Sequence, residues 1–212
     1  MVDAQVISSV VVGHPKRCVE AFELGADLVA PLSMDDGIGA DANHLRAWQM
    51  TTRFLGTWSM VVEDDAQPVE GFLAQAQAAL SVAPTPVVSF YLGQTMPVHV
   101  QEDIRAALDQ VKDAAWITSN QLLHAVAVAI RQDLVLDMLD MLDDLTGFPI
   151  DERIGAWCRI RGHRIAYTVP SLVEHADWPT LIDHLDGIPR DTPRKAWRTG
   201  TREEWNSRWV AL

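Results

Sequence analysis

The sequence predicts an α/β fold with a mainly parallel central sheet flanked by helices. Short runs rich in β-branched and aromatic residues recur along the chain, as is typical of buried strands. Between them lie stretches with apolar residues at helical spacing, and glycine or proline marks most of the junctions. Strands that alternate with helices favour a parallel sheet, because the helices form the crossovers between strands.

The first half of the chain is the more regular. We expect strands over 5–12, 27–32, 57–62 and 87–92, and helices over 16–24, 41–54 and 70–82. Gly25 is expected to stop the first helix, and Asp41 or Asn43 to cap the second. Pro84 and Pro86 end the third.

The second half alternates less clearly. Helices are predicted over 101–111, over 121–131 and 134–145 (as one or two helices), and over 151–160, with strands over 115–118 and 164–169. Residues 170–175 lead off the end of the last strand. The aspartates of 134–145 are strung along one helix, which predicts a solvated face rather than a site.

Composition limits the possible functions. A chain of 212 residues with 48% hydrophobic content predicts one domain with a sizeable core, with room for a small appendage. The net charge of −12 argues against broad non-specific binding to nucleic acid or anionic membrane. Cys18 and Cys158 are expected to be free thiols of a reducing compartment, although one disulfide stays possible. Without a basic leader or a long apolar run, we expect a soluble, cytoplasmic protein with no membrane span.

The segment 190–212 differs in composition from the domain predicted over 1–189. It holds six Lys or Arg against three acids, and three of the eight tryptophans: Trp197, Trp205 and Trp209. Such a basic, aromatic tail could close over a nucleotide or contact an acceptor. The alternative is a packing arm whose tryptophans fill a groove.

Three adjacent acids, Glu63, Asp64 and Asp65, end the apolar run that begins at Trp58. Like charges beside a buried strand repel one another and resist desolvation, so a positive group is expected there. A divalent cation that bridges to a phosphate is the usual candidate. The alternative is a solvated cap after the strand.

Four segments in this order resemble the GT-A glycosyltransferases, most closely family 25 (lipopolysaccharide-type) and small phage-encoded relatives. They are the first strand with its loop (10–17), the stretch 43–48 from Asn43 to Trp48, the acid motif (61–65), and 170–175 ending in His175. The resemblance spans roughly residues 6–177. Here the motif reads Glu-Asp-Asp where the family has Asp-x-Asp, so the division between ribose-contacting and metal-contacting acids stays open.

The resemblance implies a metal-dependent transfer of a sugar from a nucleotide-sugar donor to an acceptor hydroxyl. Asp65 and His175 would hold Mn²⁺ or Mg²⁺, which stabilises the diphosphate leaving group. The donor, with a UDP-sugar favoured, would be bound by Val12, His14, Lys16, Arg17, Asn43, Glu63 and Asp64.

Asp151 occupies the place where inverting GT-A enzymes carry the general base, on the helix before the last strand. An acid in that position could equally be an N-cap. The acceptor is left open between a protein, a glycan and a modified DNA base, as is the oligomeric state. Two other readings remain: a metal-dependent nucleotidyltransferase or phosphohydrolase, and a non-catalytic binding module of the same fold.

Overall fold

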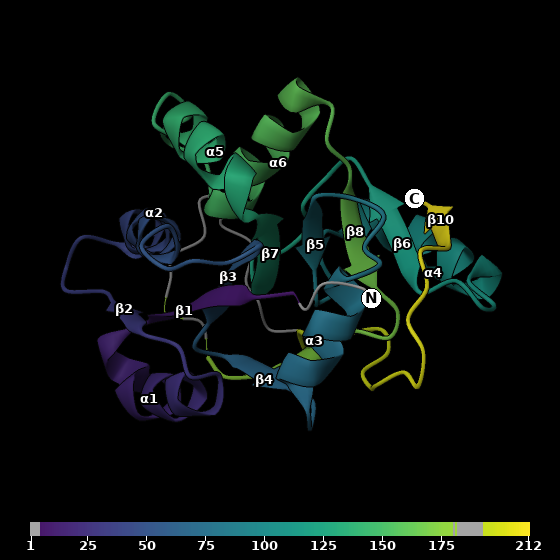
Figure 1. The fold of residues 1–212 in the computed structure, drawn as a ribbon, viewed down its shortest axis with the longest axis horizontal. Coiled ribbons are helices and arrows are strands. Elements are labelled where there is room, and N and C mark those ends of the chain that lie inside the picture. The colour runs from purple at the N-terminus through teal and green to yellow at the C-terminus, as the bar shows by residue number, and fades with distance from the viewer. Residues whose placement is uncertain (1–4, 180, 182–192) are drawn as a thin grey trace.

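The structure, a computed structural model, describes residues 5–179, 181 and 193–212. Its α-helices are α1 (Cys18–Asp27), α2 (Ala40–Thr51), α3 (Phe72–Leu80), α4 (Gln101–Gln110), α5 (Val135–Leu142) and α6 (Ile150–Arg161). Its strands are β1 (Ile7–Gly13), β2 (Leu32–Met34), β3 (Trp58–Glu63), β4 (Ala66–Pro68), β5 (Val87–Ser89), β6 (Trp116–Ser119), β7 (Ala127–Arg131), β8 (Ile165–Thr168), β9 (Val173–His175) and β10 (Trp209–Ala211). Figure 1 shows their arrangement.

Eight of these strands form one central sheet in the order β10-β6-β8-β5-β7-β3-β1-β2. Strands β1, β2, β3, β5 and β8 run in one direction, and β6, β7 and β10 run in the other. The remaining two, β4 and β9, pair with each other in a small antiparallel sheet. This confirms the predicted α/β class with a mostly parallel central sheet.

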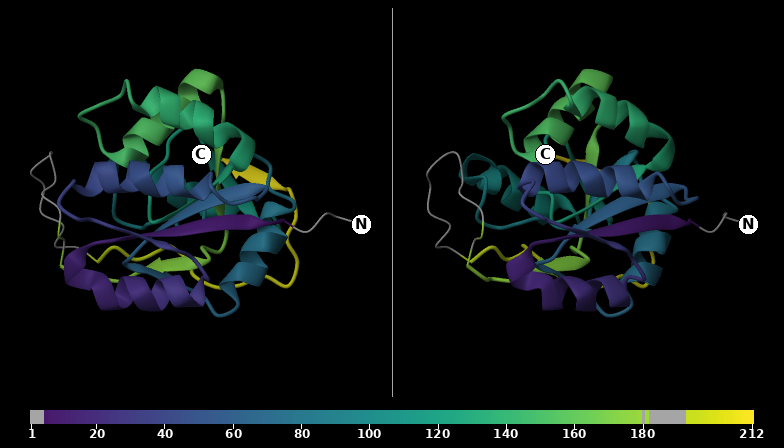
Figure 2. Two further views of the ribbon diagram at one scale, coloured as in Figure 1. Left: turned by 60° about the vertical axis from the view of Figure 1, so that its left-hand side comes forward. Right: turned by 90° about the vertical axis from the view of Figure 1, so that its left-hand side faces the viewer.

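Helices cover both faces of the sheet, so the molecule has three layers (Figure 2). One apolar cluster packs α2, α4, α5 and α6 onto one face, and a second packs α1 and α3 onto the other. The strands serve both clusters by alternation. In β1, Val10 belongs to the first cluster and Val11 to the second, and both are fully buried.

The helix predicted over 121–131 was wrong, because β7 lies there. Its residues alternate between the two clusters, with Val128 and Ile130 on one face and Ala127 and Ala129 on the other. The strand runs antiparallel between β3 and β5, in the middle of the sheet. Alanine-rich composition favours a helix locally, but a strand buried on both faces accepts small residues where the helices above it pack closely.

Two boundaries in the first half also differ from expectation. Helix α1 continues through Gly25 to Asp27, and the strand expected over 27–32 is displaced to Leu32–Met34. Helix α2 is preceded by Gly39, with φ of 90°, rather than by Asp41 or Asn43. The Oδ1 atom of Asp35 accepts hydrogen bonds from the backbone N–H groups of Gly37 and Gly39, which orders this turn.

The described part of the C-terminal segment, 193–212, lies along the protein rather than apart from it; Arg190 and Asp191 fall outside the described residues. The ring of Trp205 packs against Trp116 with a centroid distance of 5.5 Å, and its Nε1 donates to Gln75 Oε1. Trp197 Nε1 donates to Gln101 Oε1. The segment ends as β10, an edge strand beside β6.

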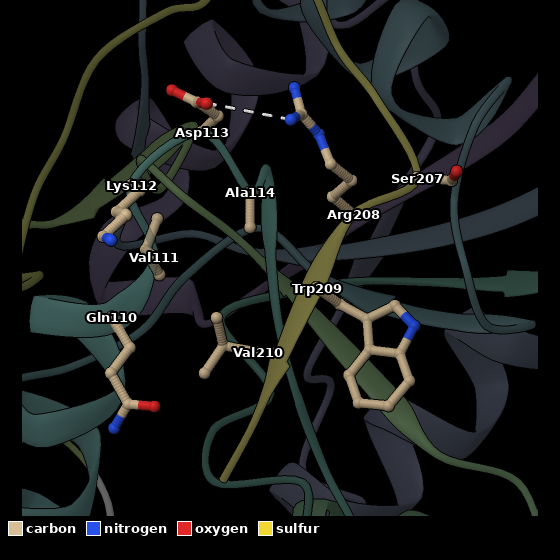
Figure 3. A pocket seen from close by; sticks show the side chains of 9 residues that line it. All are labelled: Gln110, Val111, Lys112, Asp113, Ala114, Ser207, Arg208, Trp209 and Val210. Atoms are coloured by element: carbon tan, nitrogen blue, oxygen red, sulfur yellow. Dashed lines mark ion pairs between the residues drawn. The ribbon is translucent and has the colours of Figure 1, made fainter.

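Beside β10 is a cavity of about 450 Å³ that is lined by Lys112, Asp113, Arg208 and Trp209, among others (Figure 3). In the sheet order, four strands separate β10 from β3, the strand that ends in the acids. This cavity is therefore remote from the acid cluster.

Candidate functional site

The acid cluster lies where β1 and β3 end together. These strands are parallel and in register, with Val12 opposite Glu63, so the residues after each strand emerge at the same edge of the sheet. There the backbone N–H of His14 donates to Asp64 Oδ2 at 2.7 Å. The loop after β1 thus holds the second acid of the cluster directly.

Arg17 is the positive group at the cluster. Its Nη1 lies 3.1 Å from Asp64 Oδ1 and 2.7 Å from Asp65 Oδ2, and all three side chains are largely buried. Its Nη2 donates to the carbonyl of Pro179, and its guanidinium lies over the Trp178 ring, 5.4 Å from the centroid. Burial raises the pKa of both aspartates, with Arg17 acting in the opposite sense.

His175 reaches the cluster through the small sheet. Strand β9 pairs with β4 directly after the acids, so His175 lies opposite Ala66, and the N–H of Ala176 donates to the carbonyl of Asp65. His175 Nε2 is 3.5 Å from Asp65 Oδ2. Its Nδ1 faces the carbonyl oxygen of Ala176, which fixes a proton on Nδ1 and leaves Nε2 turned toward the acid.

Glu63 is surrounded by histidines that the sequence analysis did not select. Its Oε1 lies 3.0 Å from Nε2 of the buried His44, on α2. Burial alone would raise the pKa of Glu63, but the hydrogen bond with His44 and the charges of His44 and His175 lower it. His124, whose ring packs edge-on against Tyr91, is kept neutral because burial lowers its pKa to about 4. The positions of His44 and His124 in the sequence show no spacing from the acids that would have identified them as site residues.

Asp65 and His175 could share a cation only if other ligands complete its coordination shell. Asp65 Oδ1 is buried and has no hydrogen-bond partner among the described residues, so one carboxylate oxygen is uncommitted. Within the same residues, no group of three or more His, Cys, Asp or Glu side chains is arranged to hold a metal ion. Mg²⁺ commonly binds through one or two carboxylates plus substrate phosphates, and Asp65 supplies one such carboxylate. The imidazole of His175 suits Mn²⁺ better than Mg²⁺.

Asp151 lies in the first turn of α6, where its Oδ1 accepts a hydrogen bond from the backbone N–H of Glu152. The residue that precedes the helix is Pro149, so Asp151 is not its N-cap. Burial, with a contribution from the charge of Glu63, raises the pKa of Asp151 to about 6.

A cavity of about 400 Å³ adjoins Asp151. Its lining is mixed: apolar side chains such as Leu122 and Phe148 alternate with polar or charged ones, which are His99, Gln121, Asp151, Glu152, Arg153 and Arg159. Its volume is in the range of small-molecule sites. The Asp151 carboxyl, whose pKa is raised to about 6, thus lines a space that could hold a ligand.

The remaining expected site residues lie near the cluster but differ in what they can contact. Val12 is buried in β1, and Lys16 is exposed. The Asn43 side chain is buried, where its Nδ2 donates to the carbonyls of Gly13 and Ser33. The Asn43 amide therefore ties α2 to the ends of β1 and β2, and its nitrogen is not free to bind a ligand.

The chain matches no protein-family model and no curated protein. Its fold is similar to the crystal structure of A197 from STIV, with a TM-score of 0.46 and 8% identity over 79% of this chain and 84% of that one. A similarity this low carries no argument about function. None of the helices in the described part of the chain is long and apolar enough to cross a membrane.

Proposed function

We propose that the protein is a glycosyltransferase that moves a sugar from a nucleotide-sugar donor to an acceptor hydroxyl, with inversion and with a divalent cation. The observation that carries the proposal is the meeting of Asp65 and His175 beside the acids that end β3, with Asp151 on α6 lining a cavity of its own. These residues come from three separate parts of the chain. They are the acid, imidazole and candidate base that such a transfer requires.

On the donor side, the departing diphosphate needs positive charge. Asp65 and His175 would hold Mn²⁺ or Mg²⁺, which would supply positive charge to stabilise the departing diphosphate. Arg17 and the loop of His14 lie at the same point, where they can meet phosphate or ribose. UDP is the favoured nucleotide by resemblance, and Glu63 or Asp64 would contact the ribose.

On the acceptor side, Asp151 would act as the general base. Its carboxylate takes the proton from the acceptor hydroxyl as the oxygen bonds to the anomeric carbon and the bond from that carbon to the diphosphate breaks. A base works best when its pKa is near the working pH, and the pKa of about 6 meets that condition. The cavity beside Asp151 would receive the acceptor.

A thermal-shift screen tests the donor half of the proposal. UDP-, GDP-, CMP- and dTDP-sugars are each added with and without Mn²⁺, because binding to the native state raises the melting temperature. We expect one nucleotide class to stabilise the protein in a Mn²⁺-dependent way, and Asp65→Asn to remove the effect. Stabilisation and turnover of a nucleoside triphosphate instead would favour a nucleotidyltransferase or phosphohydrolase. If no nucleotide binds, the remaining candidate is a non-catalytic module that binds another kind of ligand.

A further inference from the structure

Arg17 occupies the carboxylate oxygen that a shared cation would need. Asp65 Oδ2 is the atom that faces His175 Nε2 at 3.5 Å, and Arg17 Nη1 lies 2.7 Å from that same atom. The same nitrogen also bonds Asp64, so one guanidinium neutralises two largely buried acids. A cation placed between Asp65 and His175 would have to compete with Arg17 for Oδ2.

A divalent cation and Arg17 cannot easily pair with Asp64 and Asp65 at the same time. A divalent ion and a guanidinium about 4 Å apart repel each other strongly in a buried site where the effective dielectric constant is low. Expelling Arg17 without a new partner would leave its charge unpaired, which also costs free energy. A diphosphate removes the conflict because it brings negative charge for the cation and for Arg17 together.

The surroundings of Arg17 give it an alternative support. Its guanidinium already contacts Trp178 and the Pro179 carbonyl, which follow the His175 strand rather than the acid motif. Arg17 can therefore leave Asp65 and keep contacts at the mouth of the site. The residue belongs to the short 3-10 turn Pro15–Arg17 after β1, at the edge where the phosphates are expected.

The geometry points to Arg17 as an exchangeable internal counterion. In the free protein it neutralises Asp64 and Asp65, and it turns to the diphosphate when the cation arrives. This rests on the proposed function and deepens it, since the form of substrate that the site takes would be a cation–diphosphate complex. The cation alone is expected to bind weakly, because it must displace Arg17 without compensation.

The test compares Mn²⁺ binding, in the absence of nucleotide, to the wild type, Arg17→Met and Arg105→Met by isothermal titration calorimetry. Arg105 is the matched control: it is an exposed arginine on α4, outside the site, and it loses the same charge. We expect Arg17→Met to bind Mn²⁺ at least tenfold more tightly than the wild type, and Arg105→Met to stay within about twofold, since removal of Arg17 frees Asp65 Oδ2. In EDTA, Arg17→Met should also have a lower melting temperature, which Mn²⁺ restores.

Each outcome of the Mn²⁺ titration supports or overturns the proposed exchange of Arg17 from the acids to the diphosphate. If Arg17→Met binds Mn²⁺ no more tightly than the wild type, while the wild type binds a nucleotide sugar in a Mn²⁺-dependent way, the exchange is wrong and the transferase proposal stands. If no protein binds Mn²⁺ with any of the four nucleotide-sugar classes, both fail, and Arg17 is a permanent counterion.

A second readout serves if Arg17→Met does not fold. Binding of Mn²⁺ with the donor should change the fluorescence of Trp178, which Arg17 covers, and the change should disappear in Trp178→Phe. An equal fluorescence change in the wild type and Trp178→Phe would show that Arg17 does not move.

Discussion

The acids at the end of β3 and the acid at the start of α6 are buried in different ways. Asp64 and Asp65 share the guanidinium of Arg17, and Glu63 is bonded to His44. The Oδ1 atom of Asp151 accepts the backbone N–H of Glu152, no ion pair joins Asp151 to another described residue, and the charge of Glu63 opposes its ionisation. The difference separates two tasks, because paired carboxylates are suited to hold cations, whereas an unpaired, half-buried carboxyl is suited to exchange a proton near neutral pH.

The largest expected effect is at Asp151. Asp151→Asn should lower the transfer rate by about 10²- to 10⁴-fold, because the amide cannot take the acceptor's proton. Donor binding should persist. In the wild type, the rate should rise with pH through about 6, as the carboxyl ionises. Steady-state kinetics against pH measure both, with Asp140→Asn as the control, because Asp140 is an exposed acid that does not line the cavity beside Asp151. A wild-type rate in Asp151→Asn would exclude Asp151 as the base.

The next effect is at the paired acids. Asp65→Asn should weaken Mn²⁺-dependent nucleotide binding by about 100-fold or more, since a coordinating carboxylate contributes more than an outer-shell group. The fold should survive, because the amide has almost the same volume. Calorimetry measures the affinity, and circular dichroism checks the fold. Asp36→Asn removes an exposed acid and should change nothing. Unchanged affinity in Asp65→Asn would place the cation elsewhere.

His175 should have a smaller effect than Asp65. His175→Gln is expected to weaken the same binding by about tenfold, because a neutral ligand contributes less charge than a carboxylate. The matched control is His163→Gln, whose ring packs on Trp157 at the far end of α6. Equal affinities in the wild type and His175→Gln would show that the residue holds β9 beside β4 without binding the cation.

The smallest expected effect is on how the free energy of unfolding depends on pH, which has opposite signs for Asp151 and Glu63. The folded state holds the Asp151 proton more tightly than the unfolded state does, so the free energy of unfolding should fall as pH rises from about 4 to 6. Asp151→Asn should lose this fall and gain about 1–3 kcal/mol at pH 7. The lowered pKa of Glu63 has the opposite sign, with stability lost as pH drops below about 4.5. Urea unfolding at several pH values measures the slope of the free energy of unfolding against pH. If Asp151→Asn and Glu63→Gln changed that slope in the same direction, the comparison would be contradicted.

The class of fold and the position of the acids along the chain follow from the sequence alone. Alternation of strands and helices, with turns at glycine and proline, was enough to predict a mostly parallel sheet, because these signals are local. An apolar strand that ends in three acids likewise predicts charged groups at an edge of the sheet. The adjacent sequence could not predict that the Asp151 carboxyl is half-buried, because a solvated acid in the first turn of a helix has the same local sequence.

The group that neutralises the acids and the residues that lie beside them are known from the three-dimensional contacts. The expected positive group was a metal ion, but Arg17 lies there in the structure, because the turn after β1 and the end of β3 emerge side by side. His175 meets Asp65 through the pairing of β9 with β4, more than 100 residues apart. The strand β7 was mistaken for a helix, because its alanines favour a helix until the middle of a sheet requires small residues. Such contacts between distant segments have no local signal, so the sequence alone could not predict them.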